Sequence, residues 1–342
     1  MKVKHAVPAL AFSLLAATAL AQEQAPAPVP APEAVQVEEG EKVLIVGQRP
    51  GPGLWKVSNG DNVMWVFAKY GPLPKKMEWR SHEVEAILAK SQEYLGEPTS
   101  GAGIGWLGGL KMAFYLPQLV GMQNNPDGAK LQDVVPPETY ARWLALKEKY
   151  VGKDDDIERQ RPLFAASNLF KTGLERVGLT NKDQVAPVIA KLVKQSGIKA
   201  TYSDYQVELK DAGPLLKDFK RGQVEDAACF AATLAQLEAD IDHMRARANA
   251  WAIGDIDTIR KLDFGSRELA CRNAIETSTA FKSRPELADL RAKSHELWLA
   301  NAEKALAKNA STFAVLRMGE ILAKDGLLAR LEAKGYRVEA PE

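Results

Sequence analysis

Strand-like segments at both ends of the chain, separated by a long helical stretch, constrain its fold more than any other feature. Near the N-terminus, residues 54–57 and 63–67 flank the turn at 58–61 (SNGD), which predicts a β-hairpin. Near the C-terminus, residues 312–316 (TFAVL) predict a buried strand and residues 336–338 a short last strand. Because a strand must pair its backbone groups, we expect the two ends to meet in one sheet.

The middle of the chain has helical rather than strand-like patterning. Apolar residues recur at steps of three and four up to Trp251, which predicts one long helix from about 223 to 251. Further helices are expected at 84–95, from Pro137 onward, and at 321–334, where Gly335 ends the pattern. The sequence therefore predicts a mixed α/β fold, with a central β-sheet built from N- and C-terminal strands and a large helical middle packed around it.

The first residues have the order of an export signal. Lys2 and Lys4 precede an apolar run that ends in Ala19-Leu20-Ala21, which predicts a signal peptide over 1–21 with cleavage after Ala21. The alternative is a buried N-terminal helix. No cysteine stands at the cleavage site, so a lipoprotein is not expected. The predicted location is periplasmic or secreted.

The domain organisation after the signal follows from composition. Residues 22–41 are rich in Ala and Pro and predict an extended linker, with a ligand for a proline-binding domain as the alternative. Residues 42–342, which open with a strand-like KVLIVG, are predicted to form one domain. No later segment approaches 18 uninterrupted apolar residues, so no integral membrane segment is expected once the signal is removed.

Several function classes lack support in the sequence. With 45 Lys and Arg against 44 Asp and Glu, the chain has no excess of basic residues for binding nucleic acid. Residues 103–108 match GxGxxG, but a helix and Pro98 precede them where a dinucleotide site needs a strand. We interpret 101–109 as a flexible surface loop or a place where helices approach closely. A partner-binding loop is a further alternative, because Trp106 lies in the segment and Phe114 and Tyr115 are near it.

Residues for nucleophilic or metal chemistry are scarce. His82, His243 and His295 occur without an HExxH pattern and are interpreted as solvated surface residues. Cys229 and Cys271 are the chain's two cysteines, and in an exported protein they are candidates for a disulfide. Two buried free thiols are the alternative.

Motifs at both ends resemble those of the TraB/GumN family, within a Tiki/PrgY-like superfamily. They are GLWKVSNGD at 53–61, MWVF at 64–67, WRS at 79–81, FAVL at 313–316 and LEAKGYRV at 331–338. The resemblance spans about residues 50 to 340. The family that the chain resembles contains exported bacterial proteins, proteins associated with polysaccharide biosynthesis and the animal Tiki metallopeptidases.

The resemblance implies a metal-dependent hydrolase site made by two Gly-x-x-His motifs and a glutamate. In this chain Gly71 stands where the first histidine belongs and Glu320 where the second belongs. Arg317 replaces the second motif's glycine, and Glu97 aligns with the family glutamate. Both histidines are therefore missing from the implied site, and we expect Arg317 to pair with Glu320 or Glu97.

These residues lead to three hypotheses. The first is a degenerate, non-catalytic member, or pseudoenzyme, that binds a peptide, a glycan or an envelope protein and needs no cofactor. The second is a metal-dependent peptidase or hydrolase with an altered site that uses Glu97 and Glu320, and only this hypothesis involves a divalent metal. The third is a structural envelope component. The missing histidines favour a protein that is not an enzyme.

Overall fold

The computed structural model describes residues 52–341 with gaps at 78, 105–116, 118–119, 222–225, 240 and 262–265. The predicted signal peptide, the linker and the strand at 42–47 lie outside the described residues, as does the second half of the glycine-rich segment. These features stay predictions.

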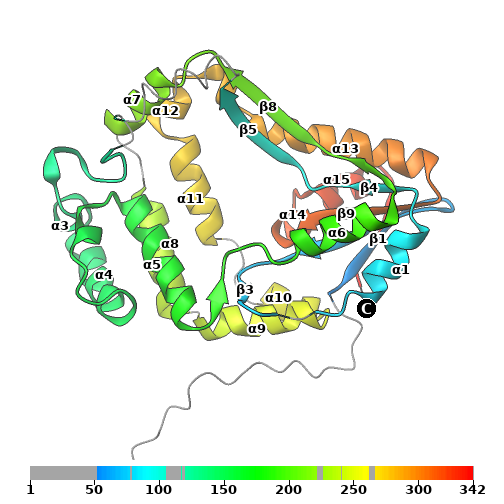
Figure 1. The fold of residues 1–342 in the computed structure, drawn as a ribbon, viewed down its shortest axis with the longest axis horizontal. Helices are drawn as coiled ribbons and strands as arrows, with labels where there is room; N and C mark the ends of the chain where they lie inside the picture. The colour runs from blue at the N-terminus through cyan, green and yellow to red at the C-terminus, as the bar shows by residue number, and fades with distance from the viewer. Residues whose placement is uncertain are drawn as a thin grey trace, which may run out of the picture. The chain divides into compact units, whose positions relative to one another are not determined.

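A six-stranded mixed sheet combines strands from both ends of the chain (Figure 1), in the order β10-β1-β2-β9-β4-β7. Its strands are β1 (Leu54–Asn59), β2 (Asn62–Lys69), β4 (Glu93–Leu95), β7 (Lys199–Thr201), β9 (Ser311–Arg317) and β10 (Arg337–Glu339). β2, β9, β4 and β7 run parallel to one another, whereas β1 is antiparallel to β2 and to β10. The predicted mixed α/β class is confirmed.

The N-terminal hairpin forms as predicted, with a tighter turn. Asn59 of β1 pairs with Asn62 of β2, so only Gly60 and Asp61 connect the two strands. Gly60 has φ +58°, a left-handed conformation that glycine adopts without the steric cost of a side chain. The predicted buried strand is also confirmed, because residues 312–316 of β9 are all buried at the centre of the sheet.

The helices make up most of the remaining chain. They are α1 (His82–Lys90), α3 (Leu131–Val134), α4 (Pro137–Tyr150), α5 (Pro162–Arg176), α6 (Ala186–Ser196), α7 (Gly213–Arg221), α8 (Ala227–Ala239), α9 (Ile241–Ala252), α10 (Ile256–Lys261), α11 (Ser266–Glu276), α12 (Thr279–Lys282), α13 (Leu290–Lys308), α14 (Met318–Leu322) and α15 (Leu327–Ala333). Three short 3₁₀ turns, η1 (Pro126–Gly128), η2 (Asp156–Arg159) and η3 (Pro285–Leu287), join some of them.

The buried apolar residues form two main clusters. One contains the sheet and the helices against it, with Phe313 of β9 and Trp298 of α13 fully buried. The other joins α4, α5 and α8 through Trp143, Phe170 and Phe230. Large side chains of this kind each contribute about 1.5–3 kcal/mol when they are removed from water, so these clusters hold the helical middle in place.

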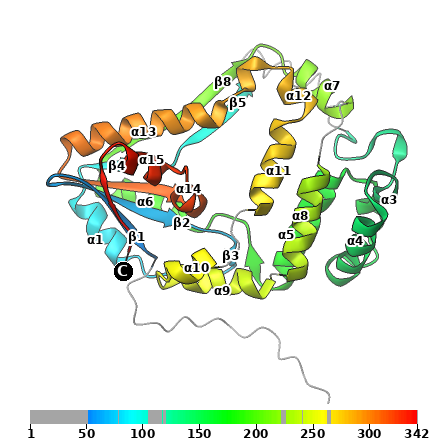
Figure 2. The same ribbon diagram turned by 180° about the vertical axis from the view of Figure 1, so that it is seen from behind.

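Two short strand pairs extend this framework. β5 (Thr99–Ile104) is parallel to β8 (Asp204–Leu209), and α13 runs alongside both (Figure 1 and Figure 2). β3 (Leu73–Pro74) pairs with β6 (Leu179–Thr180). Residues 101–104 are therefore strand, so the prediction of a loop is wrong for that part of the segment.

Three predicted helices differ from the observed ones. The long helix at 223–251 is two helices, α8 and α9, and Leu95 lies in β4 rather than in a helix. The helix at 321–334 is divided into α14 and α15, with Gly326 at the junction. A Cβ at Gly326 would collide with the backbone carbonyl oxygen of Glu320, so the chain can turn this tightly only with glycine there.

Within the part of the chain that the structure describes, no helix combines the length and the apolar character needed to cross a bilayer.

Candidate functional site

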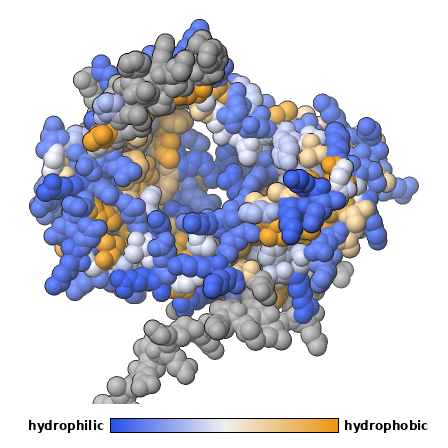
Figure 3. All heavy atoms as spheres, viewed as in Figure 1, coloured by the Kyte–Doolittle hydropathy of each residue, from blue (hydrophilic) through white to orange (hydrophobic). Residues whose placement is uncertain are grey.

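A cleft of about 850 Å³ lies beyond the carboxyl ends of β2 and β9 in the main sheet. Its walls come from the end of β2, the segment before α6, helices α10, α11 and α13, and the junction of β9 with α14. The space-filling view is hollowed near its centre, and most of the surface around the hollow is hydrophilic (Figure 3). Ligands of α/β proteins commonly bind outside the carboxyl ends of parallel strands, so this cleft is the candidate site.

The pairing of β2 with β9 brings the two sequence-predicted positions together. These strands are parallel, and their last paired residues are Lys69 and Arg317. The segments that follow them therefore leave the sheet side by side, and Gly71 and Glu320 both line the cleft. Their proximity is a direct result of strand register.

Glu97 lies next to these residues and neutralises two cations. Its Oε1 accepts a hydrogen bond from Lys69 Nζ, and its Oε2 lies 3.7 Å from Arg317 Nε. Of the two partners that we considered for Arg317, the structure pairs it with Glu97. Lys69 Nζ also donates to Asp183 Oδ2 at 2.8 Å. Although burial opposes it, the Ala186 N–H and Lys69 hold the pKa of Asp183 below its ordinary value.

Glu320 is held by two side chains of α13. Arg291 donates to Glu320 Oε1 at 2.6 Å, and His295 Nε2 lies 3.3 Å from Oε2. Burial alone would raise the pKa of Glu320, but hydrogen bonds from His295 and Arg291 outweigh it and lower the pKa to about 2. Glu320 is therefore ionised throughout the neutral range.

The interpretation of His295 as a solvated residue is wrong. Its side chain is only 14% exposed, because this face of α13 packs against α14, where Glu320 lies. Arg291 and His295 are spaced i, i+4 and so project from one helix face, which is a signal that the sequence contained. His82 and His243 are exposed, as predicted.

Helix α11 contributes two arginines that sequence reasoning did not single out. The Arg267 guanidinium lies 3.9 Å from the centre of the Phe170 ring, a cation–π contact, and its Nε has no hydrogen-bond partner among the described residues. Burial, and then the nearby Arg291 and Arg317, lower the pKa of Arg272. No ion pair of Arg272 is found in the described ranges.

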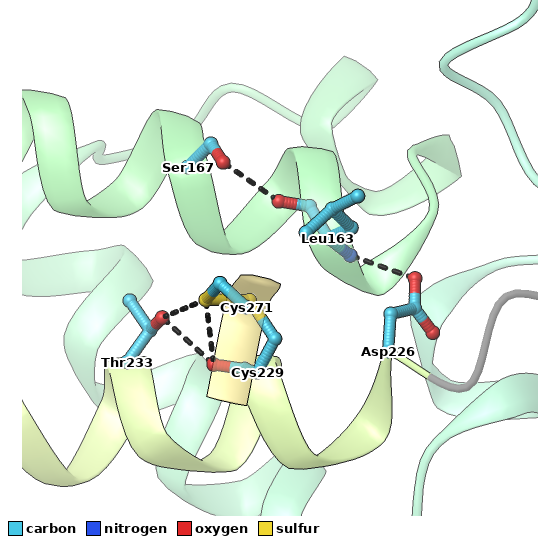
Figure 4. Close-up of a disulfide and its surroundings, with 6 residues drawn as sticks. All are labelled: Leu163, Ser167, Asp226, Cys229, Thr233 and Cys271. Atoms are coloured by element: carbon cyan, nitrogen blue, oxygen red, sulfur yellow. Dashed lines mark hydrogen bonds between the residues drawn. A yellow bond between two sulfur atoms is a disulfide. The ribbon is translucent and has the colours of Figure 1, made fainter. Parts of the chain in front are cut away.

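A disulfide fastens α11 beside the cleft. Cys229 of α8 and Cys271 of α11 are bonded, with an Sγ–Sγ distance of 2.00 Å, next to Leu163 of α5 (Figure 4). Cys271 and Arg272 are consecutive residues, so the bond positions the segment that carries this arginine. The sequence identified both cysteines as a candidate disulfide, but it did not indicate that the bond lies beside the cleft.

The cleft carries an excess of positive charge. Its lining includes seven Lys or Arg residues but four Asp or Glu residues. The basic residues are Lys69, Lys182, Arg260, Arg267, Arg272, Arg291 and Arg317. Such a surface attracts anions and repels metal cations.

The residues present do not fit the divalent metal that the family resemblance implies. Gly71 offers no ligand atom, and Glu97 and Glu320 are each engaged by nearby cations. Among the residues described, no group of three or more His, Cys, Asp or Glu side chains is arranged to hold a metal ion. A metal ion would have to displace Lys69, Arg317 and Arg291 from their carboxylate partners.

Comparison with known proteins agrees with the motifs at the two ends of the chain. Residues 53–340 match the family model of the TraB/PrgY/gumN family. Neither the curated proteins nor the solved structures include a match. The matched range contains all the strands of the main sheet and all the residues of the candidate site. The chain belongs to the TraB/PrgY/gumN family.

Proposed function

We propose that this chain is an exported, non-catalytic binding protein whose cleft holds an acidic ligand of the cell envelope. The ligand classes are an acidic glycan, an acidic peptide or an acidic segment of an envelope protein. The observation that carries the proposal is the excess of Lys and Arg over Asp and Glu around a cleft of about 850 Å³. Positive charge gathered in a concave surface raises the local concentration of anions.

The state of the two candidate carboxylates supports a role without catalysis. A general acid needs a raised pKa so that it still holds a proton near neutral pH. The pKa of Glu320 is instead lowered to about 2, and Glu97 is shared between Lys69 and Arg317. Glu320 therefore has no proton to donate near neutral pH, and both carboxylates are already engaged by cations, which supports a role without catalysis.

The test is a calorimetric titration of the purified protein with small probes of known charge. The acidic probes are an oligogalacturonate and a poly-glutamate peptide, and the neutral probes are a dextran oligomer and a poly-glutamine peptide. We expect the acidic probes alone to bind, with an affinity that falls as salt rises. Equal binding of neutral probes, or no binding of any probe, would overturn the proposal, and the latter result would favour a structural component.

A matched pair of charge reversals locates the binding. Lys182→Glu changes an exposed residue of the cleft lining, and Lys171→Glu changes an exposed residue of α5 outside it. Both variants alter net charge equally, so only the first should weaken binding, by roughly two- to fivefold for a charge at the rim. Equal effects of the two would show that attraction by overall charge, rather than the cleft, explains the binding.

A separate assay addresses the hydrolase hypothesis. The protein is incubated with peptide pools, with and without added Zn²⁺ or Mn²⁺, and products are followed by mass spectrometry. We expect no cleavage under either condition. Metal-dependent cleavage that is lost in Glu320→Ala would establish the hydrolase in place of the binding protein.

A further inference from the structure

Three arginines from three different elements face the same cleft. Arg272 belongs to α11, Arg291 to α13, and Arg317 ends β9. Each guanidinium carries a fixed charge and a planar fork of N–H donors. We refer to Arg272, Arg291 and Arg317 as the arginine cluster.

The carboxylates around the arginine cluster do not balance it. Glu320 pairs with Arg291, and Glu97 is shared between Arg317 and Lys69. Asp183 offsets Lys69. Within the described residues Arg272 has no ion-pair partner, because Glu276 and Glu320 attract it only from beyond ion-pair distance.

The contacts that do exist leave donors free for a ligand. Arg291 uses one terminal nitrogen for Glu320, and Arg317 approaches Glu97 through Nε at 3.7 Å, which is too long for a strong hydrogen bond. Arg291 and Arg317 contribute to the lowered pKa of Arg272, so the three guanidinium groups are close enough to repel one another, and Glu276 and Glu320 offset only part of this repulsion. An anion bound among the guanidinium groups of the arginine cluster would offset the repulsion that remains between them.

We infer that the arginine cluster is a binding site for a phosphate group, either free phosphate or a phosphate monoester on a small molecule. This inference rests on the proposed function, because it names the acidic group that the cleft holds. A phosphate carries a charge of about −1.5 to −2 and three strong acceptor oxygens. The three arginines supply three N–H forks from three elements, which matches the three oxygens of a phosphate in number, whereas a carboxylate has one charge and two oxygens in a plane.

Titration calorimetry with inorganic phosphate, glucose 1-phosphate and acetate tests the inference on the full chain at constant ionic strength. We expect phosphate or glucose 1-phosphate to bind at least about tenfold more tightly than acetate, the effect of one additional charge-assisted hydrogen bond. Tighter binding of glucose 1-phosphate identifies a monoester as the ligand, and tighter binding of inorganic phosphate identifies the free anion.

Substitutions in the arginine cluster provide a second test, with phosphate binding measured by the same titration. Arg272→Gln should weaken phosphate binding about tenfold or more. Arg317→Gln should act in the same direction, and its side chain is 58% exposed, so this variant is not expected to disturb folding. The matched control is Arg337→Gln in β10, which removes an equally basic residue outside the cleft and should have no effect.

The outcomes separate this inference from the proposed function. If the acidic oligogalacturonate or peptide binds but phosphate neither binds nor competes, the phosphate site is refuted and the proposed function remains. Unchanged phosphate binding in both Arg272→Gln and Arg317→Gln also refutes it. If no acidic probe of any kind binds, the proposed function itself fails.

Discussion

Reduction of the Cys229–Cys271 disulfide tests how far the packing around the cleft depends on one covalent bond. The bond links α8 to α11, which also packs against α8 and places Arg267 over the ring of Phe170. Among its residues of described burial, only Ala274 is buried, in a small cluster with Leu163 and Cys229. We therefore expect reduction to destabilise the protein and to loosen α11 in particular.

The size of the effect follows from the length of the loop that the bond closes. The two cysteines are 42 residues apart in the sequence. In the chain-entropy model, cross-linking a loop of this length stabilises the folded state by about 4 kcal/mol. The packing of α11 against α8 is the same with and without the bond, so most of the stabilisation by the bond should be lost on reduction.

Urea unfolding followed by tryptophan fluorescence measures the loss. With an m-value of about 3 kcal/mol per molar urea, a loss of about 4 kcal/mol lowers the unfolding midpoint by about 1.3 M. The double variant Cys229→Ala, Cys271→Ala is the matched control, because reductant should leave its midpoint unchanged. Amide hydrogen exchange should accelerate in α11 more than in β9.

Three results would contradict this reasoning. A decrease of less than about 1 kcal/mol in the wild-type protein would mean that the contacts of α11 suffice without the bond. An equal decrease in the double variant would mean that the reductant acts elsewhere. Faster exchange throughout the chain, with no preference for α11, would contradict the local part of the prediction.

Three further predictions concern the framework of the site. The pKa of Glu320 is about 2 in the folded protein against 4.5 ordinarily, so its ionised form adds about 3 kcal/mol to the free energy of unfolding above pH 4.5, and this contribution is lost as the pH falls toward 2. The free energy of unfolding, measured as a function of pH, should fall over this range more steeply in the wild type than in Glu320→Gln. Gly326→Ala should lower the free energy of unfolding by about 1–3 kcal/mol in urea melts, because the new Cβ meets the Glu320 carbonyl oxygen, and an unchanged midpoint would contradict this. Phe313→Ala, which empties a fully buried position, should cost about 3–5 kcal/mol, whereas an alanine at exposed Leu144 should cost under about 1 kcal/mol.

The sequence predicted those elements that pair with a neighbour close in the chain or that contain a long apolar run. The hairpin of β1 and β2 follows from two strand-like apolar segments around an Asn-Gly turn, and β9 follows from the apolar run at 313–316. The break between α8 and α9 was missed because the apolar spacing continues across it. Apolar periodicity also does not fix how wide a face the neighbours of a helix cover, and Leu144 of α4 is 44% exposed although Trp143 beside it is fully buried.

The candidate site was predictable to the extent that it depends on strand order. Once β2 and β9 are parallel neighbours, Gly71 and Glu320 must leave the sheet at the same edge. The partners of Glu320 were not predictable, because α13 is a separate helix and nothing in its sequence indicates which element its Arg291 and His295 will face. The same holds for Arg272, whose position depends on the packing of α11 against α8.

The register of β2 and β9 also explains why a negative charge at Glu97 stabilises this end of the sheet. It places Lys69 directly across from Arg317, and like charges at opposed positions of a sheet repel each other. Glu97, which follows β4 on the other side of β9, reaches both cations with its two carboxylate oxygens. A divalent metal bound to Glu97 would compete with Lys69 and Arg317 for its negative charge and would leave these two cations unbalanced. With Lys69 on one oxygen and Arg317 near the other, Glu97 is a bridge between two cations, and the other basic residues of the cleft favour an anion.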